Sequence, residues 1–158
     1  MRNYVYRLAK FSELFNQDDF DVMAADYAAE SGAAILGDAK VGKDYYYEQE
    51  ETGIAQLIVA TLNERIVGFA VLMDGYHAHF DKPVAVLDTL YVTPANRAST
   101  VGARIIAMAR AWACGKGYAL LSASAPVGSR LNALYSRIGV HTDNDYLIPV
   151  GDNRELRH

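Results

Sequence analysis

Residues 87–103 combine the residue types best suited in this chain to binding an anion. A β-rich run ends at a proline, and an apolar helical pattern begins shortly after Arg97. Backbone N–H groups at a helix N-terminus lack helical acceptors and carry positive partial charge, so they bind phosphate groups. Gly102 lets a ligand approach the backbone closely. The pattern predicts a phosphate or pyrophosphate site; the alternative is a simple helix cap at Ser99 or Thr100.

Asp88 is a second group in this segment that could do chemistry. Alternate side chains of a strand share a face, so Asp88 is expected to lie on one face with Val84, Val86, Leu90 and Val92. A carboxylate with apolar neighbours and little solvent is a better proton acceptor than one in water. Asp88 is therefore a candidate general base. The alternative is a carboxylate satisfied by backbone donors near a strand bulge.

The rest of the chain supplies the elements that would position these groups. β-rich composition predicts strands over residues 4–8, 54–62, 66–73, 84–92, 118–123 and 146–148. Helical spacing predicts helices over residues 19–30, 99–116 and 126–138. Residues 32–53 lack a clean period and are interpreted as a long loop or irregular helix, and residues 74–83 as a turn region. The order predicts an α/β (α+β) fold, with a mixed, mostly antiparallel central sheet flanked by helices.

Composition narrows the function classes. The 158 residues carry a net charge of -4 and one cysteine, Cys114, so we expect a single domain over residues 1–158 without a disulfide framework or a cysteine-based zinc site. No apolar run reaches the roughly 18 residues of a membrane span, and the N-terminus lacks a signal-peptide core. The acidic balance argues against long nucleic acid as a partner. We expect a cytoplasmic protein with no membrane partner and no metal.

Three further patterns point more weakly to chemistry. Residues 37–44 differ from a Walker A loop at the last position, where Asp44 would repel phosphate. His77 and His79 have spacing that suits a metal, but an exposed turn is the preferred interpretation. Residues 45–51 place three tyrosines before three glutamates, which suits a cationic amine; the alternative is a solvated loop.

Residues 90–102 resemble motif A of the GNAT family, the GCN5-related N-acetyltransferases. The strand part of that motif has the form L-x-V-x-P, and Leu90 and Val92 match it together with the following proline. The turn part has the form [RQ]-x-x-G-x-[GA]. Arg97 and Gly102 match this form, with Thr100 in place of its first glycine.

Two other segments carry the same resemblance. Residues 133–140 resemble the family's helix ending in L-Y-x-x-x-G-F, with valine in place of phenylalanine, and residues 66–70 resemble its third strand. The resemblance implies the GNAT acyl-CoA N-acyltransferase fold, with acetyl-CoA held between strands 84–92 and 118–123. Backbone amides of residues 97–103 would hold its pyrophosphate. The cofactor-binding residues so implied are Leu90, Tyr91, Val92, Arg97, Ala98, Ser99, Thr100, Val101, Gly102, Ala103 and Asn132.

The resemblance also implies catalytic roles. Tyr135 matches the position where the family often places its general acid; the alternative is an ordinary helix residue with a hydrogen-bonded hydroxyl. Many members carry an acid at or next to the position of Asp88, and a backbone N–H near Leu90 would stabilise the oxyanion. Gly128 stands where the family often has an asparagine that holds the CoA arm, and Asn132 follows one turn later.

The implied activity is transfer of an acetyl group from acetyl-CoA to a primary amine by direct attack on the thioester. The expected partner is a small-molecule or peptide amine, and a homodimer is compatible with the fold. Two alternatives stay open: a catalytically silent CoA-binding or sensor module, with the substitutions at Thr100 and Gly128 as its signature, and acyl transfer to a nucleotide or nucleobase amine.

Overall fold

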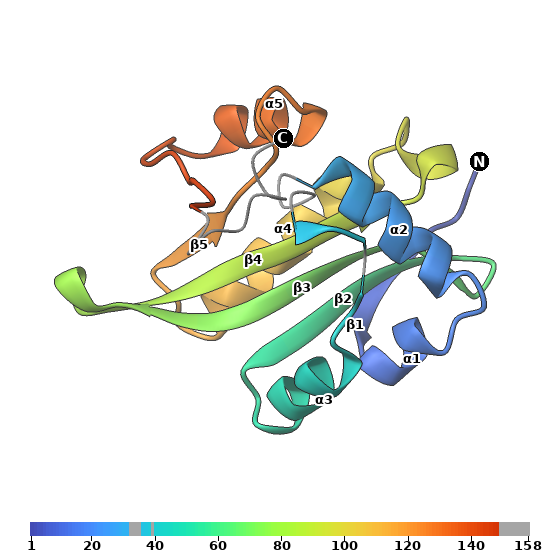
Figure 1. The fold of residues 1–158 in the computed structure, drawn as a ribbon, viewed down its shortest axis with the longest axis horizontal. Coiled ribbons are helices and arrows are strands. Elements are labelled where there is room, and N and C mark those ends of the chain that lie inside the picture. Colours follow the sequence, from blue (N-terminus) through green and yellow to red (C-terminus); the bar gives the residue numbers. More distant parts are fainter. Residues whose placement is uncertain (32–35, 39, 149–158) are drawn as a thin grey trace.

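Five strands form one sheet in the order β1-β2-β3-β4-β5 (Figure 1). The computed structural model describes residues 1–31, 36–38 and 40–148. The strands are β1 (Val5–Ala9), β2 (Ala55–Leu62), β3 (Arg65–His77), β4 (Lys82–Val92) and β5 (Leu120–Ala123). Neighbouring strands are antiparallel, except that β4 and β5 are parallel. The predicted mixed, mostly antiparallel sheet is confirmed.

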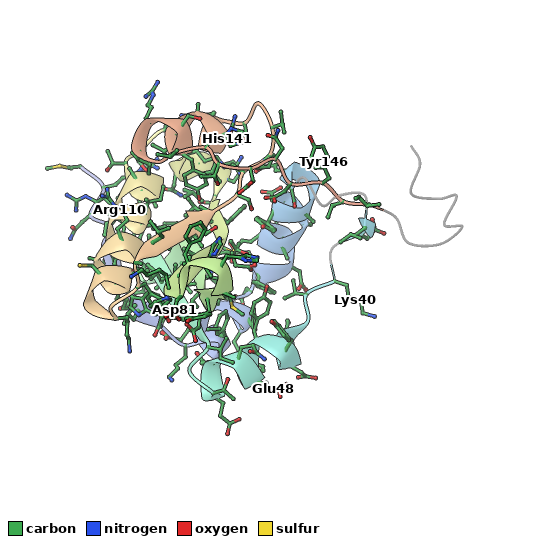
Figure 2. The ribbon with its side chains drawn as sticks, turned by 90° about the vertical axis from the view of Figure 1, so that its left-hand side faces the viewer. Lys40, Glu48, Asp81, Arg110, His141 and Tyr146 are labelled. Carbon is green, nitrogen blue, oxygen red and sulfur yellow. The ribbon has the colours of Figure 1, made fainter. Side chains whose placement is uncertain are left out.

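Helices cover both faces of the sheet. They are α1 (Phe11–Phe15), α2 (Phe20–Glu30), α3 (Lys43–Glu51), α4 (Val101–Gly115) and α5 (Arg130–Ile138). Helices α1, α2 and α3 pack on one face, and α4 packs on the other. Figure 2 shows this from the side, with Glu48 of α3 and Arg110 of α4 on opposite sides of the sheet. Helix α5 follows β5 and lies above the sheet in the view of Figure 1.

Strand β2 lies between two hydrophobic cores and alternates between them. Leu57 and Val59 point to the core under α1, α2 and α3, whereas Ile58 and Ala60 point to the core under α4. This is the period-2 geometry of a strand that is buried on both faces. The alternation explains why residues 55–60 read as a nearly continuous apolar run.

Helix α4 approaches the sheet very closely at Gly68 of β3. A Cβ atom at Gly68 would lie 3.1 Å from Cγ1 of Val101 and 3.2 Å from Cδ1 of Ile105. These two residues belong to the first turns of α4 and are fully buried. The missing side chain therefore fixes where α4 begins relative to the strands beneath it.

A β-bulge interrupts the pairing of β3 with β4. Val71 pairs with Thr89 and the next residue, Leu72, pairs with Leu87, so that Asp88 has no partner on β3. An extra residue of this kind bends its strand and increases the local twist. The bulge lies where the parallel pairing of β4 with β5 also ends.

Because of the bulge, the surroundings of Asp88 differ from those predicted. Leu87 and Leu90, three residues apart, both pack in the core under α4, as does Val92. Asp88 instead has an exposed side chain that faces the side of α3. The prediction that Asp88 shares an apolar face with Leu90 and Val92 is wrong, because one inserted residue shifts the alternation.

Residues 32–53 were predicted as a long loop or irregular helix, and their second half forms the regular helix α3. Residues 32–35 and 39 of this segment lie outside the described residues. The rings of Tyr46 and Tyr47 lie 5.2 and 5.4 Å from phenylalanine rings of α1. Tertiary packing of aromatic rings thus stabilises a helix whose sequence shows little apolar periodicity.

Two other predicted segments differ. The turn predicted over residues 74–83 is much shorter, because β3 extends to His77 and β4 begins at Lys82, and the hairpin they form projects from the body of the molecule (Figure 1). The strand predicted over residues 146–148 is absent: this segment has no regular secondary structure, and its apolar side chains are exposed. Composition favours a strand there, but no ladder with a described strand forms.

Candidate functional site

The edge of β4 that faces β5 is open beyond the bulge. Parallel pairing covers Val84–Leu87 of β4 and stops there. On the other edge, the N–H of Thr93 donates to the carbonyl of Val67 of β3. Backbone groups of successive residues in a strand point to opposite edges, so those of Leu90 and Val92 point away from β3. We call the β5-facing backbone of residues 88–92 the open edge.

The open edge leads into the turn over residues 97–103, which we call the phosphate turn. Of its N–H groups, that of Arg97 donates to the carbonyl of Pro94, and that of Ser99 to the carbonyl of Asn96. The Val101 N–H donates to the Ser99 hydroxyl at 3.3 Å, so Ser99 partly caps the helix. Within the described part of the chain, the N–H groups of Ala98, Thr100, Gly102 and Ala103 have no acceptor. Free N–H groups at the start of the 15-residue helix α4 suit an anion.

Asn96 holds the phosphate turn in place, although the sequence did not identify it as important. Its side chain is buried, and its Nδ2 donates to the hydroxyl of Thr93 at 2.8 Å. The Asn96 Oδ1 accepts hydrogen bonds from the Tyr4 hydroxyl at 2.8 Å and from Arg2 at 3.1 Å. These donors come from the N-terminus of the chain. The position of an asparagine directly after a strand-ending proline and alanine is the only local signal of this role.

Arg97 makes its side-chain contacts with β4 and α2. Its Nε donates to the carbonyl of Val92 at 2.8 Å, and its guanidinium pairs with Glu30 of α2 at 2.7 Å. The guanidinium also lies over the ring of Tyr91, 5.6 Å from the ring centroid. The Tyr91 hydroxyl donates to Asp26 of α2 at 3.0 Å. Arg97 and Tyr91 therefore join the end of β4 to α2.

Asp88 lies among hydroxyl groups on the side of the sheet that α2 and α3 cover. The Thr89 hydroxyl donates to its carboxylate at 3.1 Å. Burial, with the charge of Asp88 as the next cause, raises the pKa of Tyr46 to about 12. The Tyr46 phenol thus stays protonated at neutral pH and can donate to the Asp88 carboxylate. The structure brings Asp88 to the open edge but leaves it accessible to water.

Tyr135 comes to the same region from α5. Its side chain is partly buried, and burial raises its pKa above the ordinary tyrosine value, with a smaller contribution from Tyr27 of α2. A phenol in this state is a proton donor and not a base at neutral pH. Tyr27 also contributes to the raised pKa of Tyr46. The sequence predicted a helix over residues 19–30 but gave no functional role to Tyr27 within it.

Asn132 lies on the exposed side of α5. Its backbone N–H donates to the Ser129 hydroxyl at 3.1 Å, which caps the helix, and its side chain is exposed. Gly128 has φ of +74°, a left-handed conformation that favours glycine. The glycine at this position therefore has a conformational reason that is independent of any ligand.

Of the weaker motifs, only residues 45–51 reach this site, through Tyr46. Tyr46 and Tyr47 pack into the aromatic core, and Glu50 accepts the Phe11 N–H at 2.9 Å, so that much of residues 45–51 has a structural role. In the described ranges no group of three or more His, Cys, Asp or Glu could hold a metal ion. Over those same ranges, no helix has both the length and the apolar character needed to cross a membrane.

Comparison with known proteins gives a consistent match. The model of the acetyltransferase (GNAT) family matches residues 12–140. A ribosomal-protein-alanine N-acetyltransferase from Brucella melitensis biovar Abortus 2308 is 19% identical with a TM-score of 0.71, covering 94% of this chain and 99% of that one. No curated protein sequence matches the chain.

Two further solved structures share the fold. An aminoglycoside acetyltransferase from an uncultured soil metagenomic sample, in complex with sisomicin, is 14% identical with a TM-score of 0.64 over 94% of each chain. An aminoglycoside N-acetyltransferase in complex with CoA is 14% identical with a TM-score of 0.67, over 96% of this chain and 97% of that one.

Proposed function

The chain belongs to the acetyltransferase (GNAT) family, and from that premise we propose that it transfers an acetyl group from acetyl-CoA to a primary amine of a small molecule. The observation that carries this proposal is the continuity of the open edge with the phosphate turn. An extended pantetheine arm can pair with a free strand edge, and a pyrophosphate can bind at a helix N-terminus. The two parts of one CoA molecule thus have adjoining partners.

The residues present fit such a ligand. Leu90 and Val92 would offer outward backbone groups to the pantetheine arm, although Arg97 already occupies the Val92 carbonyl. At Gly102, an added Cβ would find its nearest heavy atom at 3.8 Å, so the missing side chain is not required by packing within the protein. Pyrophosphate would bind the free N–H groups of Ala98, Thr100, Gly102 and Ala103.

The chemistry follows from the groups around the bulge. Bound acetyl-CoA supplies a thioester carbonyl that an amine can attack. An outward N–H of the open edge would donate to the carbonyl oxygen as it gains negative charge. Asp88 would take the proton of the amine through a water molecule, since its side chain is exposed. Tyr135 would donate its proton to the sulfur as the C–S bond breaks and the C–N bond forms, and solvent would then reprotonate it.

Electrostatics support a cationic acceptor. Asp26 and Asp88 lie on α2 and at the bulge, with the phenol rings of Tyr27 and Tyr46 in the same region. The charge of Glu30, also on α2, is paired with Arg97. Carboxylates attract ammonium groups, and aromatic faces add cation–π attraction. Several of the structures similar to this chain are aminoglycoside acetyltransferases, which also favours a small-molecule acceptor.

Calorimetry with acetyl-CoA, followed by thiol release across a panel of amines, tests the proposal. We expect saturable binding and turnover with at least one cationic amine. Binding without turnover on any amine would instead favour a silent CoA-binding module, and turnover only with nucleotide amines would favour that acceptor class. An absence of heat and of thermal shift at millimolar acetyl-CoA would overturn the proposal.

Tyr135→Phe tests the general acid. We expect kcat to fall by about 10-fold, below the usual range for acid catalysis because a thiolate is a good leaving group. Acetyl-CoA affinity should stay within twofold of the wild type. Tyr76→Phe, in the projecting hairpin, is the matched control. An unchanged kcat in Tyr135→Phe would remove this residue from the mechanism.

A further inference from the structure

Helix α2 carries two carboxylates where its own electrostatics disfavour them. Asp26 and Glu30 are four residues apart, and Glu30 is the last residue of the helix. Like charges at this spacing repel each other, and the C-terminal end of a helix is negative. The last turn of α2 contains no basic residue that would compensate. A partner outside the helix would offset this cost, although the Glu30 side chain is itself 54% exposed.

That partner is the end of β4. Asp26 accepts the Tyr91 hydroxyl at 3.0 Å, and Glu30 pairs with Arg97 at 2.7 Å. The Arg97 side chain is itself held by the Val92 carbonyl at 2.8 Å and by the ring of Tyr91. These four side chains connect one end of α2 to the open edge, and we call them the α2 latch.

The latch directs the Arg97 guanidinium toward α2. Among the described residues, the Arg97 side chain contacts the Val92 carbonyl, the Tyr91 ring and Glu30, and it makes no hydrogen bond within the phosphate turn. Because the guanidinium is paired and oriented, using it to bind pyrophosphate would require breaking the contact with Glu30. The free N–H groups at the start of α4 need no such rearrangement.

We propose that Glu30 is a positioning residue, which acts through Arg97 to hold α2 against the open edge and so places α2 beside the attacking amine, on what we call the acceptor side of the site. In this arrangement the Arg97 side chain positions the acceptor side and does not bind the pyrophosphate. The inference rests on the proposed function, because it assigns α2 to the acceptor side of that site. The sequence motif alone does not distinguish an Arg97 side chain that binds pyrophosphate from one that positions α2.

The test compares Glu30→Gln, Arg97→Gln and the double variant. We expect Glu30→Gln to raise KM for the best amine of the panel by about 2- to 5-fold, as for a partly exposed ion pair. Arg97→Gln, which also loses the contacts with Val92 and Tyr91, should raise it at least as much, and the double variant should match Arg97→Gln. The dissociation constant for acetyl-CoA should stay within about twofold in all three. Arg110→Gln, on the opposite side of the sheet, is the control for loss of one positive charge (Figure 2).

A second measurement needs no amine. In hydrogen exchange, the amides of α2 should exchange faster in Glu30→Gln than in the wild type, while those of α4 keep their rates. Arg97→Lys keeps the charge but loses the Nε donor, so it should give an intermediate KM.

Specific results would overturn the inference. A more than 10-fold loss of acetyl-CoA affinity in Arg97→Gln, with normal affinity in Glu30→Gln, would make Arg97 a phosphate ligand. An amine KM and α2 exchange unchanged in Glu30→Gln would remove Glu30 from any positioning role. Both results are distinct from failure of the proposed function, in which the wild type itself would not bind acetyl-CoA.

Discussion

The two sides of the candidate site are built in different ways. The donor side, comprising the open edge and the phosphate turn, consists of backbone groups from one continuous segment, residues 88–103. The acceptor side consists of side chains from separate elements: Tyr27 of α2, Tyr46 of α3, Asp88 of β4 and Tyr135 of α5. A backbone site depends on the path of the chain, whereas a side-chain site depends on how distant elements pack together.

The two sides also differ in charge. The start of α4 presents free N–H groups and a positive helix end, while α2 and the bulge present carboxylates. An anionic donor and a cationic acceptor would therefore be drawn to opposite ends of one site. The contrast predicts that acetyl-CoA binding tolerates the loss of single side chains but not a side chain that blocks the backbone N–H groups. Amine binding should instead be sensitive to the loss of single side chains.

Obstructing the donor backbone should have the largest effect. Gly102→Val would place a branched side chain beside N–H groups that have no acceptor in the described structure. We expect acetyl-CoA affinity, measured by calorimetry, to fall by about 10- to 100-fold, the loss of one or two charge-assisted hydrogen bonds. Ala107→Val, at an exposed position of α4, is the control. An affinity equal to that of the wild type would show that this turn does not hold the phosphate.

Displacing α4 from the sheet should come next. In Gly68→Ala, the new Cβ would crowd Val101 and Ile105 at 3.1 and 3.2 Å. We expect the free energy of unfolding in urea to fall by about 1–3 kcal/mol, with a parallel loss of acetyl-CoA affinity. Gly115→Ala, where the added Cβ meets no heavy atom within 4 Å, serves as the matched variant. Equal stability of the two variants would contradict the role of Gly68.

High pH should weaken the acceptor side through its phenols. Burial raises the pKa of Tyr46 to about 12, whereas an unfolded tyrosine titrates near pH 10. The folded state thus keeps a proton that the unfolded chain loses. The contribution of Tyr46 to the free energy of unfolding is therefore at its maximum below pH 10 and declines between about pH 10 and 12. Denaturant titrations of Tyr46→Phe should show a smaller decline than the wild type. Tyr45→Phe, whose side chain is exposed, is the control, and identical declines in Tyr46→Phe and the wild type would contradict the assignment.

Removing one hydroxyl next to Asp88 should have the smallest effect. Thr89→Val deletes the donor 3.1 Å from the exposed carboxylate. A single hydrogen bond at an exposed site contributes about 0.5–1 kcal/mol, so kcat should fall by roughly two- to fivefold. Thr89→Ser should restore most of it. If Thr89→Val equals the wild type while Thr89→Ser does not, the methyl group of Thr89 matters and its hydroxyl does not.

This division also explains what could be predicted from the sequence. The sheet, its four longest strands and helices α2, α4 and α5 follow from local composition and periodicity, and an anion site could be predicted over residues 97–103 because these residues are contiguous. Helix α3, the role of Asn96 and the α2 latch depend on contacts between residues far apart in the chain. The surroundings of Asp88 were predicted wrongly because period-2 alternation does not reveal an inserted residue.

The bulge at Asp88 has a consequence for the design of variants. The residues on either side of it, Leu87 and Thr89, pair with consecutive residues of β3. Deleting Asp88 should therefore leave all the remaining residues of β4 in their present register and on their present faces. A variant that lacks Asp88 should therefore form the same sheet, without the bulge and without the carboxylate. Such a chain would be a scaffold from which the two sides of the site could be rebuilt one at a time.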